Sequence, residues 1–170
     1  AKFRGKFDEG WDVLRQRIFE RQKRLGVIPA NARLAALPPE VKPWNSLSES
    51  EKRVAARFME AYAAALAFCD DQIDRLFDTL ERNGQIDNTL VIYIQGDNGA
   101  TPEGGSHGIV NYAGRFQIEP DMDAALAEID KIGGPESYPA APLGWMMAMN
   151  TPFPYHKVIA SRLGGITNGM

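Results

Sequence analysis

The amino-acid sequence predicts an α/β fold that is rich in helix. Residues 48–83 carry apolar side chains at three- and four-residue steps, which is the spacing of an amphipathic helix. Residues 89–94 are apolar or β-branched at every position, as in a strand covered on both faces of a parallel sheet, and we expect this strand to span 89–95. A long helix followed after a short turn by such a strand is half of a β-α-β unit.

Length, composition and charge exclude several classes of protein. The 170 residues are 44% hydrophobic and 24% charged, as in one globular domain. The formal net charge of -3 lacks the basic bias of nucleic-acid-binding proteins, so no nucleic-acid partner is expected. No apolar run approaches the roughly 18 residues of a membrane span, and no signal peptide opens the sequence. Cys69 is the only cysteine, which excludes an internal disulfide framework.

The first third of the chain predicts a helix and then an extended connector. Apolar residues recur at helical spacing over residues 8–25, and Gly26 follows as a left-handed C-cap. Residues 27–45 contain four prolines and no sustained period, so we expect them to form a Pro-rich connector.

The long helix has a start signal, an apolar stripe and a stop signal. Ser48 and Glu51 have the spacing of a capping box, and Asn83 with Gly84 marks the end. The stripe consists of Val54, Phe58, Tyr62, Leu66, Cys69, Ile73, Phe77 and Leu80. A helix on the order of 50 Å long with such a stripe is expected to lie against a large surface.

Beyond the strand the sequence predicts a glycine-rich loop over 96–118, a helix over 119–132 and an irregular region over 133–170. One strand cannot form a sheet, so we expect its partner strands to come from outside these residues. Ala1 is not an initiator Met, and we interpret the sequence as a piece of a longer chain.

Four polar residues are candidates for chemistry. Asp97 and Asn98 follow the predicted strand, where open α/β sheets bind ligands, and their oxygen atoms suit Ca²⁺ or Mg²⁺. An Asp-Asn-Gly string is also an ordinary turn, so both interpretations stay open. His107 follows two glycines and could line the same pocket, and Lys157 stands in a segment rich in proline and aromatic residues that could aim it at an anion. Solvated surface side chains are the alternative for both.

Several strings resemble motifs of bacterial arylsulfatases, in the alkaline phosphatase superfamily. Residues 96–100 (GDNGA) and 103–105 (EGG) resemble the GDNGAS-x-EGG segment of that family. Further matches occur in the same order at residues 25–30 (LGVIPA), 44–48 (WNSLS), 81–90 (ending in DNTL), 133–135 (GGP) and 144–165 (GW through TPF to GG). The resemblance covers nearly the whole chain.

The resemblance implies part of an alkaline-phosphatase-like catalytic domain that hydrolyses sulfate esters. Members of this family use a formylglycine nucleophile beside a Ca²⁺ ion. Asp97 and Asn98 would be two of the calcium ligands, and the ammonium of Lys157 would pair with the sulfate oxygens. His107 is the further catalytic candidate. For a bacterial parent the resemblance suggests the periplasm or the exterior.

The sequence also departs from the family pattern. It contains no C/S-x-P-x-R string, the source of formylglycine, and Arg162 and Thr167 replace an expected His and Arg. The calcium site would therefore be incomplete, and the chain alone is expected to be inactive. Two alternatives stay open: a phosphomonoester or phosphonate hydrolase of the same superfamily, and a non-catalytic, helix-rich interaction module that self-associates through its long helix. Two histidines are few for a two-zinc phosphatase.

Overall fold

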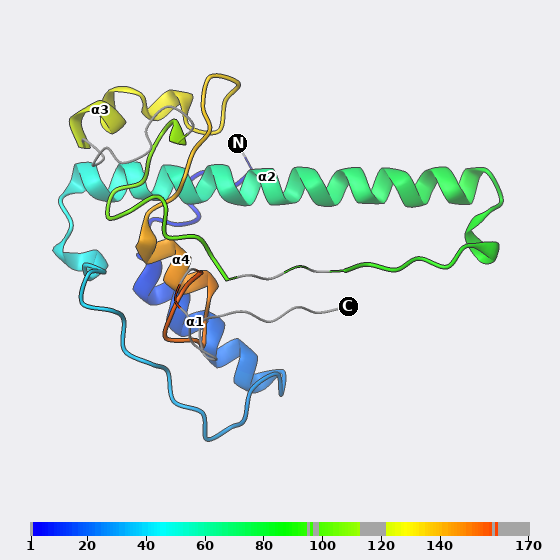
Figure 1. The fold of residues 1–170 in the computed structure, drawn as a ribbon, viewed down its shortest axis with the longest axis horizontal. Coiled ribbons are helices and arrows are strands. Elements are labelled where there is room, and N and C mark those ends of the chain that lie inside the picture. The colour runs from blue at the N-terminus through cyan, green and yellow to red at the C-terminus, as the bar shows by residue number, and fades with distance from the viewer. Residues whose placement is uncertain (1, 95, 97–98, 113–121, 158, 160–170) are drawn as a thin grey trace.

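The computed structural model describes residues 2–94, 96, 99–112, 122–157 and 159. The regular elements of this part are all helical (Figure 1): α1 (Gly10–Arg24), η1 (Trp44–Ser46), α2 (Glu49–Arg82), η2 (Ile86–Asn88), α3 (Met122–Ala127), η4 (Ile129–Lys131) and α4 (Leu143–Met149). Helices α1 and α4 lie on one side of the N-terminal part of α2, and α3 lies on the other side. None of the helices among these residues is long and apolar enough to cross a membrane.

Helix α2 begins and ends where its sequence signals predict. The Glu51 amide donates to the Ser48 hydroxyl at 3.2 Å, and the Ser48 amide donates to Glu51 Oε2 at 2.7 Å. Both bonds of the capping box are therefore formed, which satisfies two amides that the first turn leaves open. Asn83 is the C-cap, and Gly84 follows with a φ of 64°.

Three tryptophans form the centre of the larger core cluster. Trp11 of α1, Trp44 of η1 and Trp145 of α4 have ring centroids 4.8–5.5 Å apart. The indole N–H of Trp145 donates to the carbonyl of Ala55 in α2 at 2.8 Å. Gly144 permits the close approach, because a Cβ there would lie 2.3 Å from the Trp11 ring. This cluster joins α1, α2 and α4 into one unit.

A second core cluster fixes α3 and η4 on the opposite side of α2. Its buried members are Val54, Phe58, Val110, Ala125, Ile129 and Ile132. The expected helix over 119–132 is wrong as one continuous element, because α3 ends at Ala127 and a 3₁₀ turn follows at Ile129–Lys131. This tighter turn brings Ile129 and Ile132 onto the same buried cluster. Residues 119–121 lie outside the described residues.

The expected strand over 89–95 does not form in the described residues 89–94. Thr89 has the backbone angles of an extended strand. The segment is nevertheless exposed to solvent, with Leu90 84% and Ile94 67% exposed. A strand is stable only when a neighbour satisfies its backbone groups, and no described segment pairs with Leu90, Val91 or Ile92 through backbone hydrogen bonds. The α/β core is thus not formed in the described part, where the β pairings are two isolated bridges, Ile109–Ala140 and Asn111–Tyr138.

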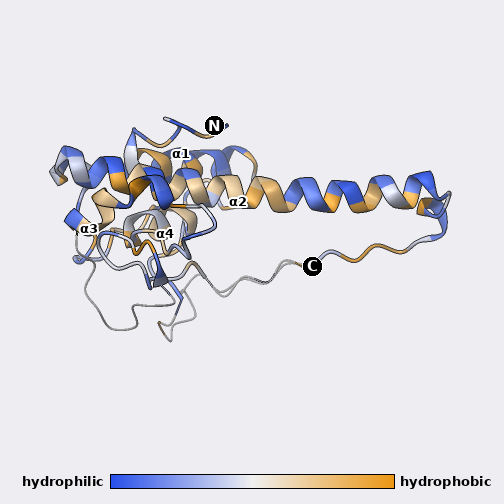
Figure 2. Ribbon diagram, turned by 90° about the horizontal axis from the view of Figure 1, so that it is seen from above, coloured by the Kyte–Doolittle hydropathy of each residue, from blue (hydrophilic) through white to orange (hydrophobic). Residues whose placement is uncertain are grey.

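Only the first part of the α2 stripe is covered. Val54 and Phe58 of the stripe are buried, whereas Tyr62 and Leu66 are 44% and 63% exposed and Cys69 is also exposed. The last members of the stripe, Ile73, Phe77 and Leu80, are half-buried. Figure 2 shows hydrophobic residues along the half of α2 that projects from the rest of the molecule. The expectation that the whole stripe lies against a large surface is therefore wrong for the described residues.

The expectation of an irregular region over 133–170 missed helix α4. The many prolines of this region predicted a loop. Pro142, however, is the N-cap of α4, where proline's lack of a backbone N–H removes no helical hydrogen bond. Trp145, Met147 and Ala148 of this helix are fully buried, so tertiary packing stabilises a segment too short for its own periodicity to be recognised.

Candidate functional site

Two segments that are far apart in sequence meet directly after the Asp97–Asn98 pair. The amide of Ala100 donates to Asn150 Oδ1 at 2.9 Å, and the amide of Lys157 donates to the Ala100 carbonyl at 3.0 Å. Asp97 and Asn98 lie outside the described residues. The structure therefore brings Lys157 to the chain two residues beyond that pair.

A tight turn fixes the loop that follows. The Gly105 amide donates to the Pro102 carbonyl at 2.9 Å, and the Gly108 amide donates to the Gly104 carbonyl at 2.8 Å. Gly104 lies directly on residue 141, because a Cβ at this position would be 2.0 Å from the Ala141 carbonyl oxygen. A side chain here would push the loop away from the backbone of Ala140 and Ala141, so this position requires glycine.

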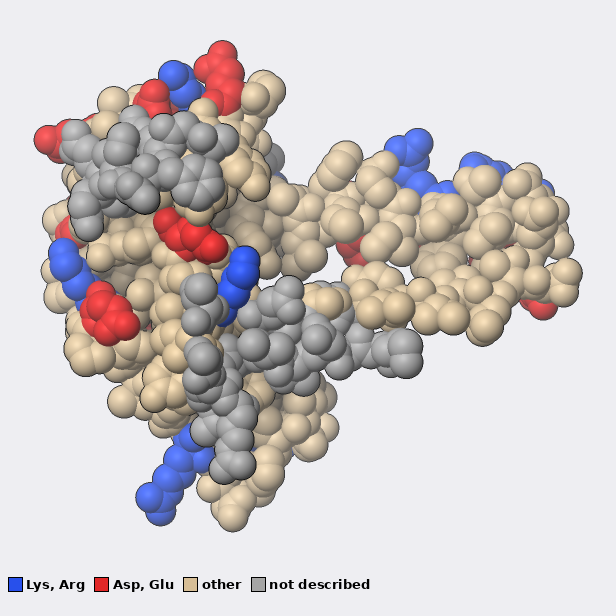
Figure 3. All heavy atoms as spheres, viewed as in Figure 1, with Lys and Arg blue, Asp and Glu red and all other residues tan. Residues whose placement is uncertain are grey.

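Glu103 on this turn faces Lys157. Its Oε1 lies 3.8 Å from Lys157 Nζ, and the two side chains are 30% and 46% exposed. Its other oxygen, Oε2, is buried and has no hydrogen-bond partner among the described residues, and the same holds for Thr101 Oγ1. Figure 3 shows several acidic and basic side chains close to one another on the face of the molecule that it presents. The site thus combines a cation with buried oxygen atoms that no described group satisfies.

His107 makes its contact with α2. Its Nδ1 lies 3.6 Å from Oε1 of Glu51, the capping-box residue. Glu51 also accepts hydrogen bonds from the Ser48 amide and from Lys42 Nζ at 3.2 Å. The Ser48 bond, assisted by Lys42, lowers the pKa of Glu51 against the opposing effect of burial. The contact of His107 with Glu51 links the loop to the N-terminus of α2, and its catalytic role stays a prediction.

Helix α1 holds the other segment of the site. Gln22 Nε2 donates to the Thr151 carbonyl at 2.8 Å. On the same helix Arg15 is only 5% exposed, and its Nε and Nη2 have no partner among the described residues. Burial lowers the pKa of Arg15, and the nearby Asp12 opposes this shift. Sequence reasoning missed both residues, although Arg15 shares the helical spacing of Trp11 and lies four residues away.

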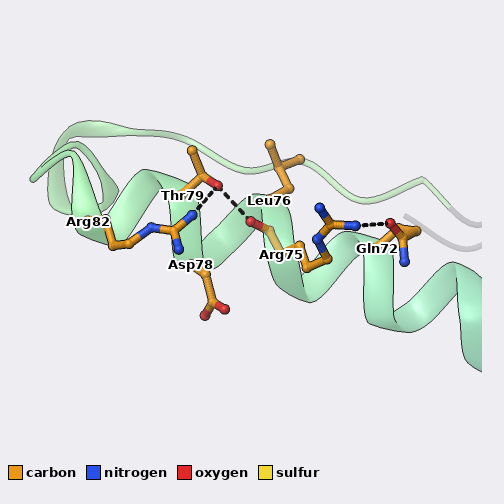
Figure 4. Close-up of a pocket in the computed structure, with 6 residues that line it drawn as sticks. All are labelled: Gln72, Arg75, Leu76, Asp78, Thr79 and Arg82. Atoms are coloured by element: carbon orange, nitrogen blue, oxygen red, sulfur yellow. Dashed lines mark hydrogen bonds between the residues drawn. The ribbon is translucent and has the colours of Figure 1, made fainter.

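Two hollows lined by described residues lie away from this loop. A groove of about 640 Å³ runs between the middle of α2 and residues 133–141. A second hollow of about 400 Å³ lies on the last turns of α2, where Arg75 Nη1 donates to Gln72 Oε1 and Arg82 Nη2 donates to Thr79 Oγ1 (Figure 4). Because these polar groups already pair with one another, the second hollow offers little to a ligand.

The described residues do not complete a metal site. Across 2–94, 96, 99–112, 122–157 and 159, no three His, Cys, Asp or Glu side chains gather where they could hold a metal ion. The calcium ligands expected at Asp97 and Asn98 fall in the gap of this range.

Comparison with known proteins decides the family. The sulfatase family model matches residues 1–128. The chain belongs to the sulfatase family. Within it, an arylsulfatase of Klebsiella aerogenes is 32% identical over 167 residues, which is 97% of this chain and 34% of that enzyme. An uncharacterised sulfatase of Schizosaccharomyces pombe is 44% identical over 104 residues, or 58% of this chain and 18% of that protein. The sulfatase chain thus spans about a third or less of the length of these relatives, and the resemblance found in its motifs is confirmed.

Proposed function

We propose that this sulfatase chain forms part of a hydrolase that cleaves sulfate esters, as the name of its Klebsiella relative suggests for that protein. The observation that carries the proposal is the docking of the Lys157 segment onto Ala100. A cation is thereby held beside the loop where the sequence predicts a metal pair. A singly charged sulfate ester needs such an environment, because negative charge grows on the departing oxygen as the S–O bond breaks.

In this proposal Asp97 and Asn98 hold a Ca²⁺ ion. The neighbouring groups fit a hard cation, because Thr101 Oγ1 and Glu103 Oε2 are buried oxygen atoms without a described partner. Calcium, when bound, would supply positive charge beside the sulfate group. Both the metal and its ligands are proposals that rest on the donor chemistry of this loop.

Lys157 is proposed to pair with the sulfate oxygens. Its ammonium lies 3.8 Å from Glu103 Oε1, which is beyond hydrogen-bond distance, so an anion can compete with this carboxylate for the cation. The side chain is 46% exposed, so a ligand can reach it from solvent. His107 is the further catalytic candidate, and its 3.6 Å contact with Glu51 would then orient its ring.

The nucleophile of the proposed reaction is formylglycine. No C/S-x-P-x-R string occurs in these 170 residues, so in this proposal another part of the polypeptide supplies that residue. The 170-residue chain alone is accordingly expected to leave 4-nitrophenyl sulfate intact. Turnover that exceeds a Lys157→Met control would contradict this expectation.

The anion-binding role of Lys157 can be tested by titration of the chain with sodium sulfate in a calorimeter. Lys157→Met is expected to abolish saturable binding. Lys131→Met is the matched control, because Lys131 is 49% exposed and has a glutamate partner at 3.3 Å, as Lys157 has at 3.8 Å. Equal loss in both variants, or no loss in either, would contradict the proposal. Tighter binding of phosphate than of sulfate would favour a phosphoryl-transfer enzyme instead.

A further inference from the structure

Asn150 joins three other segments of the chain. The residue is only 6% exposed. Its side chain accepts from the Ala100 amide at 2.9 Å and donates to the Tyr155 carbonyl at 3.1 Å. Its backbone amide donates to the Met146 carbonyl in α4 at 3.0 Å, and its carbonyl accepts from the Phe153 amide at 2.8 Å. Every polar group of this buried residue therefore has a partner.

These bonds hold the backbone of Ala100 from two sides. Its N–H donates to the Asn150 side chain, and its C=O accepts from the Lys157 amide at 3.0 Å. Tyr155 lies between Asn150 and Lys157 in the sequence, and its carbonyl accepts a hydrogen bond from the Asn150 side chain, which holds this segment to Asn150. Any shift of residues 150–157 against the loop must break at least one of these hydrogen bonds.

We propose that Asn150 is a positioning residue that helps to set the place of Lys157 relative to the loop at Ala100. The inference rests on the proposed function, because Lys157 is the sulfate-binding cation of that proposal. An amide side chain suits this task, since it offers an acceptor to one N–H and a donor to one C=O in a fixed plane. Aspartate keeps the acceptor alone, and leucine keeps neither.

Among the described residues, the other side-chain hydrogen bonds of this segment do not reach the loop. Gln22 Nε2 donates to the Thr151 carbonyl at 2.8 Å, and Thr151 Oγ1 donates to the Ala148 carbonyl at 2.6 Å. These bonds attach residue 151 to α1 and α4. Within the described part of the chain, the side-chain bond to Ala100 comes from Asn150. Asn150 therefore adds a side-chain hydrogen bond to a coupling that the Lys157 amide bond and the Glu103–Lys157 ion pair also carry.

Amide hydrogen exchange followed by NMR tests the hydrogen bond between Asn150 and Ala100 in the 170-residue chain. Asn150→Leu is expected to speed exchange of the Ala100 amide at least tenfold and to speed that of Lys157 as well. Asn150→Asp keeps the acceptor, so exchange at Ala100 should stay within about threefold of wild type. Asn31→Leu, at an exposed position of the connector, is the control and should change neither rate. Unchanged exchange in Asn150→Leu, or an unprotected Ala100 amide in the wild type, would overturn the inference.

If circular dichroism shows that Asn150→Leu does not fold, the exchange rate of the Ala100 amide in Asn150→Asp is the test. A tenfold faster Ala100 exchange in Asn150→Asp would contradict the assignment of its Oδ1 as acceptor.

Titration with inorganic sulfate then separates this inference from the proposed function. Asn150→Leu is expected to weaken the Lys157-dependent binding about tenfold, and Asn31→Leu should leave it unchanged. If sulfate binding does not depend on Lys157, the proposed function is refuted. Exchange of the Ala100 amide would still test the hydrogen bond from Ala100 to Asn150. Binding that depends on Lys157 but is equally tight in Asn150→Leu would refute the positioning role.

Discussion

Replacing Trp145 by alanine should remove a large part of the stability of this chain. The side chain is fully buried and packs edge-on or tilted against Phe7, Trp11 and Trp44, with ring centroids 5.5–5.7 Å away. It also donates the 2.8 Å hydrogen bond to Ala55. Truncation of a buried tryptophan costs about 3–5 kcal/mol, which is a substantial part of the roughly 5–15 kcal/mol that stabilises a typical domain.

Urea unfolding followed by the helical circular dichroism signal measures this loss. With a slope of about 2 kcal/mol per molar urea, a loss of about 4 kcal/mol lowers the midpoint by roughly 2 M. Phe68→Ala is the matched control, because this aromatic residue on the projecting part of α2 is 65% exposed. Its replacement should change the free energy of unfolding by no more than about 0.5 kcal/mol.

Two results would refute this reasoning. A loss below about 1 kcal/mol for Trp145→Ala would mean that the tryptophan cluster does not hold α1, α2 and α4 together. A loss for Phe68→Ala as large as that for Trp145→Ala would mean that the projecting part of α2 is covered in solution, as the self-association alternative requires.

Three further predictions concern the cap, the loop and the pH dependence. Ser48→Ala should cost about 1 kcal/mol of unfolding free energy, measured by thermal melting, and no change would contradict the capping box. Gly104→Ala should cost about 1–3 kcal/mol and weaken sulfate binding, because the new Cβ meets the Ala141 carbonyl oxygen; an unaffected titration would show that the loop relaxes freely. Since the pKa of Glu51 is lowered from 4.5 on folding, its stabilising effect is complete above about pH 4.5 and disappears as the pH falls through the lowered value. Urea midpoints of Glu51→Gln should therefore fall less than those of wild type on acidification, and parallel curves would contradict the assignment.

Local signals predicted the helices of the first half well. The capping box at Ser48 and the stop at Asn83 give α2 its bounds, because these signals satisfy the open backbone groups of the helix ends themselves. Helix α1 was likewise predicted by the spacing of its apolar residues. Such signals lie within the element, so no knowledge of distant residues is needed.

Tertiary packing decided the features that sequence reasoning missed. Residues 89–94 have strand composition, yet a strand requires a partner, and the described residues supply none beside Leu90 and Val91. Helix α4 forms because the pocket around Trp145 buries it, which no local pattern reveals. The same distinction holds in the site. A sequence motif predicted Lys157, whereas the roles of Glu103 and Asn150 depend on contacts between residues about 50 positions apart in the sequence.

Calcium dependence of sulfate binding tests most directly the claim that Lys157 and the Asp97–Asn98 pair form one site. The calorimetric titration with sulfate would be repeated with and without CaCl₂ for wild type, Asp97→Ala and Lys157→Met. Asp97 and Asn98 supply few of the six to eight oxygens that Ca²⁺ prefers, so the metal alone should bind on the order of millimolar. The account predicts that calcium strengthens sulfate binding in the wild type and has no effect in either variant. Two results would contradict it: calcium still strengthens sulfate binding in Asp97→Ala, or calcium does not change the sulfate affinity of the wild type.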